Sequence, residues 1–456
     1  MRTRRDFIVG SAMAATGFSA EGRSVAERKV PSVASTDVLV AGGGPAGFVA
    51  AIAAARNGAK VALVESFGFP GGMATAGLVG PISKFNFGGK RVVGGIPVEF
   101  IDRLASVGGA IVDLPKGNVP FDAELYQRVA REMLEEAGVR CLWQTSVCGE
   151  PEVDAENRLV AANLSTAGFL SRIEAKMFVD CTASGALVGH HGFGRFRSAK
   201  GEAQPLSLYF ILGGVDTSRL KVLFRTDAER SSNPILRQAL AKAVAAGRLK
   251  SFGGPWAVWG SAMRPGFVSV NATRAVGDVT DPEEVAAATE SLRRDIPVII
   301  DVLRRAEPAF ADAWLDRTAA ACGFRECREL VALHRVTAAE LVSGEPTPDT
   351  IAFGAHPMDR HVGNSADQRL TFLKRPYPIP FSALVSAKCP NLLAAGGLVA
   401  AEPQAFASMR VQAQCMAMGQ AAGTAAALCA ESGVSPRALH IGRLTSRLRE
   451  QKAFLG

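Results

Sequence analysis

The stretch Asp37–Gly77, DVLVAGGGPAGFVAAIAAARNGAKVALVESFGFPGGMATAG, decides the fold. A short apolar, β-rich run over Val38–Ala41 enters a glycine turn, and an alanine-rich run over Pro45–Arg56 predicts a helix. A second apolar run, Lys60–Val64, then ends in Glu65. Strand, glycine turn, helix, strand and terminal acid form the unit that binds a dinucleotide.

Each part of this unit has a physical reason. The glycines fall at Gly42, Gly44 and Gly47, in the pattern G-x-G-x-x-G. Gly42 permits the tight turn, Gly44 lets the backbone approach a pyrophosphate, and Gly47 lets the helix pack against the strand. The free N–H groups and the positive end of the helix favour phosphate. Glu65 can accept hydrogen bonds from both ribose hydroxyls, which argues against a 2′-phosphate and leaves NAD and FAD.

Four later motifs decide between these two dinucleotides. Gly71-Gly72 followed by Thr75 forms a Gly-Gly-x-x-Thr motif, and Phe178–Leu187 reads FVDCTASGAL. Asn391–Gly397 reads NLLAAGG and precedes a run of small residues over Ser408–Ala427. Together these motifs resemble the large FAD-dependent oxidoreductase family, in its glutathione-reductase-like subgroup. The resemblance covers nearly all of residues 36–430 and implies FAD as the cofactor.

The resemblance also implies which residues contact FAD. They lie in the glycine turn, after the second strand, in the Gly-Gly-x-x-Thr motif and in the later segments: Gly42, Gly43, Gly44, Pro45, Ala46, Gly47, Glu65, Ser66, Gly71, Gly72, Met73, Ala74, Thr75, Val147, Thr182, Ala183, Gly185, Gly396, Gly397, Ser408 and Met409. Two departures bear on these contacts. The family's Thr-Gly-Asp-Gly turn is Thr182-Ala183-Ser184-Gly185 here, and Gly397 stands where the family usually has Arg.

The expected fold is α/β, with a Rossmann-like, three-layer FAD-binding domain that carries a β-meander, plus an inserted α+β substrate domain. The expected boundaries are residues 36–195 and 371–435 for the two parts of the FAD-binding domain, 196–370 for the substrate or cap domain, and 436–456 for a C-terminal tail. The meander is expected from strands at Val139–Val147, Leu159–Ser165, Phe169–Ala175 and Met177–Cys181. Glu345–Asn364 is expected to be a long loop over the site, and Ser408–Ala427 one helix.

Residues 1–26 resemble a twin-arginine signal peptide. Thr3–Ile8, TRRDFI, is similar to the export motif, and a modest apolar stretch, Phe7–Ala20, follows it. Cleavage is predicted after Ala26. No segment is long and apolar enough for stable membrane insertion. The prediction is that the twin-arginine translocation machinery exports the folded, FAD-loaded protein to the periplasm, and the alternative is a disordered basic N-terminus.

Composition excludes some partners. The 456 residues carry a net charge of +8, and 48% are hydrophobic and 21% charged, as in an ordinary globular protein. No dense Lys/Arg run or aromatic-basic patch indicates nucleic acid. The eight cysteines show no metal-site spacing, so no metal is expected. A basic protein is compatible with an acidic small-molecule substrate, although most such charge is solvated surface.

A dehydrogenase needs a base that takes the substrate's proton as hydride leaves for flavin N5, and histidine suits this near neutral pH. His361 and His356 lie in FGAHPMDRH, where the family often has a histidine motif, and Tyr377 is a weaker candidate. Arg410, expected in the first turn of the helix near Ser408, would stabilise negative charge on the flavin or bind an acidic substrate. Its alternative role is a structural ion pair.

The predicted function is an FAD-dependent dehydrogenase or oxidase that takes hydride from a small organic substrate. An external acceptor, which is a quinone, a small carrier or oxygen, would then receive the electrons. One alternative is a reductase like the fumarate reductase flavoproteins, with Arg325, Arg328 and Arg335 supplying part of an arginine cluster. Another is a non-catalytic FAD-binding protein.

Overall fold

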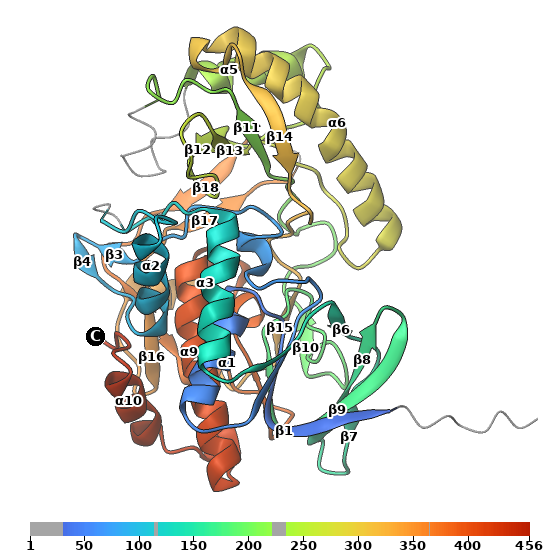
Figure 1. Cartoon of the computed structure of the whole chain (residues 1–456), viewed down its shortest axis with the longest axis vertical. Helices are drawn as coiled ribbons and strands as arrows, with labels where there is room; N and C mark the ends of the chain where they lie inside the picture. Colours follow the sequence, from blue (N-terminus) through green and yellow to red (C-terminus); the bar gives the residue numbers. More distant parts are fainter. Residues whose placement is uncertain (1–30, 114–116, 221–233, 364) are drawn as a thin grey trace, which may run out of the picture.

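The computed structural model describes residues 31–113, 117–220, 234–363 and 365–456 (Figure 1). The predicted signal peptide, residues 1–26, lies outside the described residues. A central sheet of eight strands organises the chain, with the path β5-β2-β1-β9-β8-β6, while β20 pairs with β9 and β7 with β8. These strands are β1 (Ser32–Ala41), β2 (Val61–Val64), β5 (Arg140–Leu142), β6 (Thr145–Val147), β7 (Glu152–Val153), β8 (Leu159–Thr166), β9 (Phe169–Asp180) and β20 (Leu392–Ala394).

The two faces of this sheet are covered differently. Strands β5, β2, β1, β9 and β20 are parallel, whereas β6, β7 and β8 pair antiparallel as a meander. Side chains alternate along a strand, so Val38 and Val40 of β1 pack among the helices, while Leu39 and Ala41 pack with the meander. The α/β prediction with a parallel FAD-type sheet and a β-meander is confirmed.

Helices α1 (Pro45–Arg56) and α9 (Gln412–Ser432) pack together over one face of the sheet, beside α2 (Ile96–Ser106) and α3 (Ala123–Glu136) (Figure 1). The contact between α1 and α9 is close because α9 carries two glycines where it crosses α1. A Cβ at Gly419 would overlap the carbonyl oxygen of Ala46, and one at Gly423 would overlap that of Ala50. None of the described helices is long and apolar enough to cross a membrane.

A second, antiparallel sheet lies beyond the first (Figure 1), in the order β12-β13-β11-β14. Its strands are β11 (Phe210–Gly213), β12 (Trp256–Val258), β13 (Val268–Asn271) and β14 (Trp314–Thr318), and helices α5 (Pro234–Ala245) and α6 (Pro282–Ala306) pack beside it. Four two-stranded pairings complete the sheets, formed by β3 (Asn86–Phe87) with β4 (Lys90–Arg91), β10 (Gly194–Phe196) with β15 (Arg328–Leu330), β16 (Thr350–Gly354) with β19 (Tyr377–Pro380), and β17 (Met358–His361) with β18 (Gln368–Thr371).

Four local predictions are wrong. The two strands expected over Phe169–Cys181 are one strand, β9, and the strand expected over Val139–Val147 is broken into β5 and β6 around Gln144, which has a positive φ of 51°. Glu345–Asn364 is not a long loop, because β16 and β17 occupy it. Each strand has an antiparallel partner later in the chain: β16 pairs with β19, and β17 pairs with the nearby β18.

The fourth error concerns the helix expected over Ser408–Ala427. Helix α8 (Pro403–Met409) ends there, Val411 is extended with φ −77° and ψ 153°, and α9 begins at Gln412. The break comes from outside the segment, since no proline or glycine lies between the two helices. Arg410, at the break, donates through Nη2 to the backbone oxygen of Asp359 at 3.1 Å.

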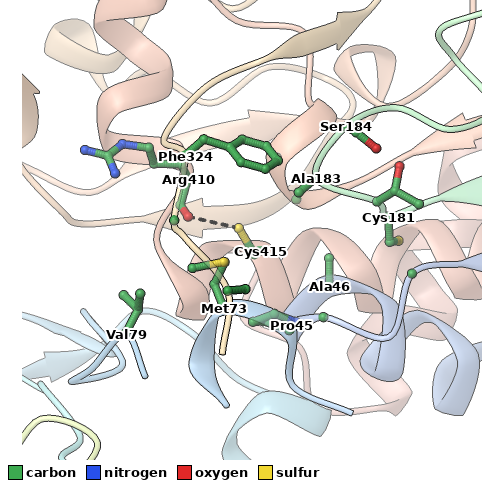
Figure 2. A pocket seen from close by; sticks show the side chains of 18 of the residues that line it. Pro45, Ala46, Met73, Val79, Cys181, Ala183, Ser184, Phe324, Arg410 and Cys415 are labelled. Carbon is green, nitrogen blue, oxygen red and sulfur yellow. Dashed lines mark hydrogen bonds between the residues drawn. The ribbon is translucent and has the colours of Figure 1, made fainter. Parts of the chain in front are cut away.

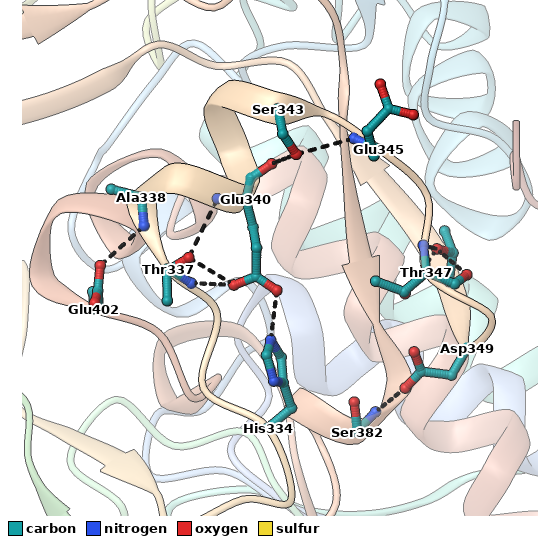
Figure 3. Close-up of polar contacts among 11 residues, drawn as sticks. His334, Thr337, Ala338, Glu340, Ser343, Glu345, Thr347, Asp349, Ser382 and Glu402 are labelled. Atoms are coloured by element: carbon teal, nitrogen blue, oxygen red, sulfur yellow. Dashed lines mark hydrogen bonds and ion pairs between the residues drawn. The ribbon is translucent and has the colours of Figure 1, made fainter.

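The short helix before β16 has a capped N-terminus that is hydrogen-bonded to the start of α8 (Figure 3). Thr337 and Glu340 form a capping box at α7 (Ala338–Ser343), and Glu340 also binds His334 Nε2 at 2.7 Å. Glu402, the residue before α8, accepts from the backbone N–H of Ala338 at 3.0 Å. The carboxylate thereby joins the first turn of α7 to the first turn of α8.

Candidate active site and cofactor-binding cavity

A cavity of about 610 Å³ opens at the carboxyl ends of β1, β2 and β9. That volume lies in the range of small-molecule and cofactor sites, and this edge is where open parallel sheets bind ligands. In Figure 2, Pro45 and Met73 lie at the bottom of the view, Arg410 and Phe324 at upper left, and Cys181 and Ser184 at upper right. Fourteen of the predicted site residues line it: Gly42, Gly44, Pro45, Ala46, Glu65, Ser66, Gly72, Met73, Val147, Thr182, Ala183, Gly396, Gly397 and Arg410.

The N-terminus of α1 is open to an anion. Gly44 is the N-cap, no side chain caps the helix, and no acidic residue lies in the first turn. The first N–H groups of the helix therefore lack side-chain acceptors at the cavity wall. A Cβ on Gly44 would meet nothing within 4 Å, so the space in front of this turn is free.

The other glycines of the motif are packed tightly. Gly42 has φ +89°, and a Cβ there would lie 2.9 Å from the Cys181 backbone. A Cβ on Gly47 would overlap the carbonyl oxygen of Gly42. Gly42 thus needs its left-handed conformation, Gly47 needs contact with the turn, and only Gly44 faces open space.

Glu65 is only 5% exposed and is held firmly. Its Oε2 accepts from the Gly43 N–H at 2.6 Å, and its Oε1 accepts from the Phe67 N–H at 2.8 Å and the Ser66 hydroxyl at 3.0 Å. A carboxylate has about four acceptor positions, so one remains for a ribose hydroxyl. Gly43 itself lies behind the cavity lining, where it orients Glu65.

The second cofactor turn depends on a residue that the sequence analysis missed. Asp180, at the end of β9, is fully buried and accepts from Thr182 N at 3.0 Å, Thr182 Oγ1 at 2.7 Å, Leu187 N at 2.8 Å and Val188 N at 3.0 Å. Burial raises the pKa of Asp180, against these hydrogen bonds. Asp180 fixes the unusual Thr-Ala-Ser-Gly turn, and its position directly after an apolar strand could have indicated this role.

Several predicted cofactor contacts lie behind the lining instead of in it. They are Gly43, Gly47, Gly71, Ala74, Thr75, Gly185, Ser408 and Met409. Thr75 donates to Pro70 O at 2.9 Å, and Gly71, with φ +110°, has that side chain against it. Ser408 Oγ donates to His356 O at 2.5 Å and lies 2.8 Å from Tyr377 Oη. In the structure Thr75 and Ser408 therefore hold the wall of the cavity.

Arg410 lies in the cavity wall but not where it was predicted. It is the C-cap of α8, not part of a first helical turn. The helix end that reaches the cavity is that of α9, through Val411 and Gln412, and α9 has neither a side-chain cap nor an acidic residue in its first turn. This end carries the positive helix dipole that was expected at Ser408.

The two candidate histidines lie beside the cavity and are neutral at pH 7. Burial lowers the pKa of His361 to about 3, Arg325 and Arg274 acting in the same direction and Asp359 opposing them. Burial lowers the pKa of His356 to about 4. His361 Nε2 lies 3.5 Å from Asp359 Oδ2. Neither ring lines the cavity, so their catalytic roles stay predictions.

Tyr377 is fully buried in the core and also lies outside the cavity lining. Of the three arginines considered for a substrate cluster, only Arg325 lines the cavity. Arg328 donates to Ser184 O at 2.9 Å, and Arg335 pairs with Glu329 at 2.8 Å. Within the described ranges, no three His, Cys, Asp or Glu side chains gather as a metal site.

The sequence analysis missed most of the opposite wall. It is formed by the segment before β11 and the segment after β14, with Ser207, Tyr209, Phe324, Arg325 and Glu326. Behind Ser207 lies Arg274, buried and only 3% exposed. No local pattern marks Arg274, because the titratable groups that act on it, Tyr209, Asp359 and Arg410, lie about 60 to 140 residues away along the chain.

The whole cavity fits a flavin dinucleotide. It presents an uncapped helix N-terminus, a buried carboxylate suited to a ribose and a second turn across the sheet edge, all on one surface. These features match the chemistry of pyrophosphate, ribose and an extended cofactor.

Comparison with known proteins supports this assignment. The family model described as FAD dependent oxidoreductase matches residues 37–448. Among solved structures, a geranylgeranyl bacteriochlorophyll reductase-like protein from Thermoplasma acidophilum is similar at 13% identity, with 92% of this chain and 85% of that chain covered and a TM-score of 0.45. The p-nitrophenol 4-monooxygenase of Pseudomonas putida DLL-E4 matches at 14% identity, with 92% and 84% covered and a TM-score of 0.47.

A flavin-dependent brominase matches at 14% identity, with 92% of this chain and 83% of that chain covered and a TM-score of 0.46. A search of curated protein sequences finds no match. The family match spans the whole described cavity and includes both walls. The chain belongs to the family of FAD-dependent oxidoreductases, and FAD is its cofactor.

Proposed function

We propose that this protein is an FAD-dependent dehydrogenase or oxidase of the glutathione-reductase-like subgroup, which oxidises a small organic substrate. The observation that supports it best is the composition of the cavity. One end presents the phosphate and ribose features, and the other presents Tyr209, Phe324 and Arg325 from segments flanking a different sheet. A cofactor alone does not require that second wall, whereas a substrate does.

Different protein groups would contact the different parts of FAD. The N-terminus of α1 would hold the pyrophosphate, and Glu65 would hold a ribose. FAD, when bound, supplies an acceptor for two electrons and takes hydride at N5. The N-terminal end of α9 would stabilise the negative charge that the flavin ring gains on reduction, near N1 and O2.

His361 is the proposed proton acceptor for the substrate's hydroxyl or amine. It is neutral at pH 7, which leaves it able to accept a proton, and Asp359 lies close enough to stabilise the imidazolium. A pKa of about 3 makes it a weak base in the free protein. An anion bound beside Arg325 would offset the positive charge that lowers this pKa, and so would raise it.

The test is an absorption spectrum of the purified flavoprotein, before and after anaerobic addition of pools of small acids, alcohols and amines. We expect one pool to bleach the flavin bands. His361→Gln should retain the flavin and lose most of the bleaching rate, while the exposed control His440→Gln should behave as wild type. Flavin that no pool bleaches would refute the oxidative direction.

A reductase like the fumarate reductase flavoproteins is the second candidate, and Arg274, Arg325 and Arg410 favour it because such an enzyme needs arginines around its substrate. Chemically reduced protein should then be reoxidised anaerobically by an unsaturated dicarboxylate. If neither bleaching nor reoxidation occurs, the non-catalytic FAD-binding reading is favoured.

We also propose export to the periplasm by the twin-arginine route, on the basis of the sequence TRRDFI. Replacing Arg4 and Arg5 together by Lys should retain the protein in the cytoplasm with its flavin content unchanged. Periplasmic and cytoplasmic fractions, immunoblotted for both forms, measure this. A variant that still reaches the periplasm would contradict the proposal.

A further inference from the structure

Three arginine side chains meet at the second wall of the cavity. Arg325 and Arg410 line it, and Arg274 lies behind Ser207. Their charges act on one another: burial lowers the pKa of Arg325 well below its usual value, and both Arg274 and Arg410 lower it further. Within the described residues, none of the three forms an ion pair with a carboxylate.

The guanidinium groups of Arg274 and Arg325 donate hydrogen bonds to neutral acceptors, and not every donor has an acceptor. Arg274 Nη1 donates to Ser207 Oγ at 2.9 Å, Asn271 Oδ1 at 2.7 Å and Thr273 O at 2.7 Å, while its buried Nη2 has no hydrogen-bond partner. Arg325 donates to the backbone oxygen of Pro205. Burial lowers the pKa of Arg274 to about 10, Arg410 acts in the same direction, and Tyr209 and Asp359 oppose them.

Arg410 is also incompletely satisfied. Its Nη2 donates to Asp359 O at 3.1 Å and to Gln204 Oε1 at 3.4 Å, whereas its Nε is buried without a partner. The Gln204 amide nitrogen, in a side chain that is 4% exposed, also lacks a partner. Arg274, Arg410 and Gln204 thus each keep a buried donor that is not used.

Two carboxylates lie near this group, and neither neutralises it. Asp359 accepts from Gln368 Nε2 at 2.6 Å and lies 3.5 Å from His361. Glu326 accepts from the Gln204 N–H at 2.7 Å, and its charge acts on the buried Arg197, which already pairs with Glu329. One carboxylate, Asp359, is left to face three guanidinium groups.

Burying like charges without counter-charges is unfavourable, and it is retained where a ligand supplies the missing charge. A guanidinium matches a carboxylate with two parallel hydrogen bonds. We propose that the substrate is a small organic carboxylate, and that Arg325 and Arg410 bind its carboxylate group at this wall while Arg274 supports them from behind. This inference rests on the proposed function, since it names the substrate class of that site.

The neighbouring side chains indicate what else the substrate presents. Phe324 and Tyr209 line the same wall. Tyr209 accepts from Asn271 Nδ2 at 2.6 Å through its hydroxyl oxygen, which leaves its own O–H free to donate. A carbon skeleton beside the carboxylate would therefore find one aromatic ring and one hydroxyl donor.

The test is a binding titration of the FAD-loaded protein, followed by perturbation of the flavin absorption bands. Succinate and benzoate are the anionic probes, and succinamide and benzamide are their neutral counterparts. We expect both carboxylates to perturb the bands, and each amide to bind at least about tenfold more weakly, because hydrogen bonds to charged groups are the stronger ones. Equal binding of acid and amide, or no perturbation by either acid, would overturn the proposal.

Variants locate the site. Arg325→Gln and Arg410→Gln should each weaken carboxylate binding about tenfold to hundredfold with FAD content unchanged. Arg325→Lys keeps the positive charge but removes the paired N–H donors of the guanidinium, so its loss of carboxylate affinity should be smaller than that of Arg325→Gln. Arg293→Gln removes an exposed arginine that donates to Thr318 Oγ1 and should bind as wild type. If Arg325→Gln and Arg325→Lys both lose FAD itself, the arginine serves the cofactor and the proposal fails.

This experiment separates the proposal from the proposed function. Carboxylate binding is read from the oxidised flavin and needs no turnover. Binding without any bleaching would refute the dehydrogenase and retain the anion site, whereas bleaching by neutral substrates alone would retain the dehydrogenase and refute the anion site.

Discussion

The open space in front of Gly44 allows a sharp test of the cofactor site. In the variant Gly44→Asp the new side chain meets no atom of the protein within 4 Å of its Cβ, so the fold has room for it. Gly44 is also the N-cap of α1 in an extended conformation, with φ −65° and ψ −174°, which suits aspartate. We therefore expect the apoprotein to be as stable as wild type, or more stable by a few tenths of a kcal/mol.

FAD binding should respond in the opposite direction. The carboxylate would stand where the pyrophosphate is expected, and two unit charges about 4 Å apart repel by about 4 kcal/mol at an effective dielectric constant of 20. That corresponds to a loss of roughly a thousandfold in affinity. The same carboxylate would also occupy the N–H groups that α1 offers to the phosphate.

The assay is the flavin content of the purified protein and titration of the apoprotein with FAD, together with its melting temperature. Gly44→Ala is the matched control, since it adds a Cβ in open space without charge and should retain most of the FAD. If Gly44→Asp retained full flavin content, the glycine turn would not hold the pyrophosphate. If it unfolded the apoprotein, the account of Gly44 as an open cap would be wrong.

Three further predictions concern stability. Gly423→Ala should lower the free energy of unfolding by about 1–3 kcal/mol in urea titrations, because its Cβ would overlap the carbonyl oxygen of Ala50; unchanged stability would refute the close contact of α9 with α1. Thr337→Ala should cost about 0.5–2 kcal/mol by removing the capping box with Glu340 (Figure 3), and an unaltered urea midpoint would contradict that role. The pKa of His361 is about 3 in the folded protein and about 6.5 in the unfolded chain, so only the unfolded chain gains a proton between these values. Lowering the pH from 6.5 to 5 should therefore decrease the free energy of unfolding by up to about 2 kcal/mol. Urea titrations at both pH values should show a smaller loss for His361→Gln, and an equal loss would show that this ring is not the group responsible.

The cofactor half of the molecule could be predicted because its signals are local. The glycine turn, α1, β2 and Glu65 lie within one stretch of sequence, and each is specified by its own neighbours. The cap of α3 is equally local, because the Asp122 side chain accepts from the backbone N–H groups of Glu124 and Leu125. In this half, local secondary-structure propensity agrees with the fold, so the sequence alone predicts the elements correctly.

The substrate half depends on contacts between distant segments. Arg274, Arg325 and Arg410 come from three separate parts of the chain, and only the fold brings their charges together. Likewise, the break between α8 and α9 is invisible in a run of good helix formers, because its partners are Gln204 and Asp359. Helix propensity depends on local sequence, so it cannot predict a break caused by contacts with residues about 50 to 200 positions away.

The packing of α9 against α1 has a consequence for the biogenesis of the protein. The first cofactor segment, with α1 at Pro45–Arg56, leaves the ribosome long before the helix that packs against it, because α9 spans Gln412–Ser432. Gly396, Arg410 and Cys415 of the cavity wall are equally late. The flavin site therefore stays incomplete until α9 has been synthesised, and cofactor capture must follow the synthesis of this helix. Truncation before α9 should leave a chain that is synthesised but colourless.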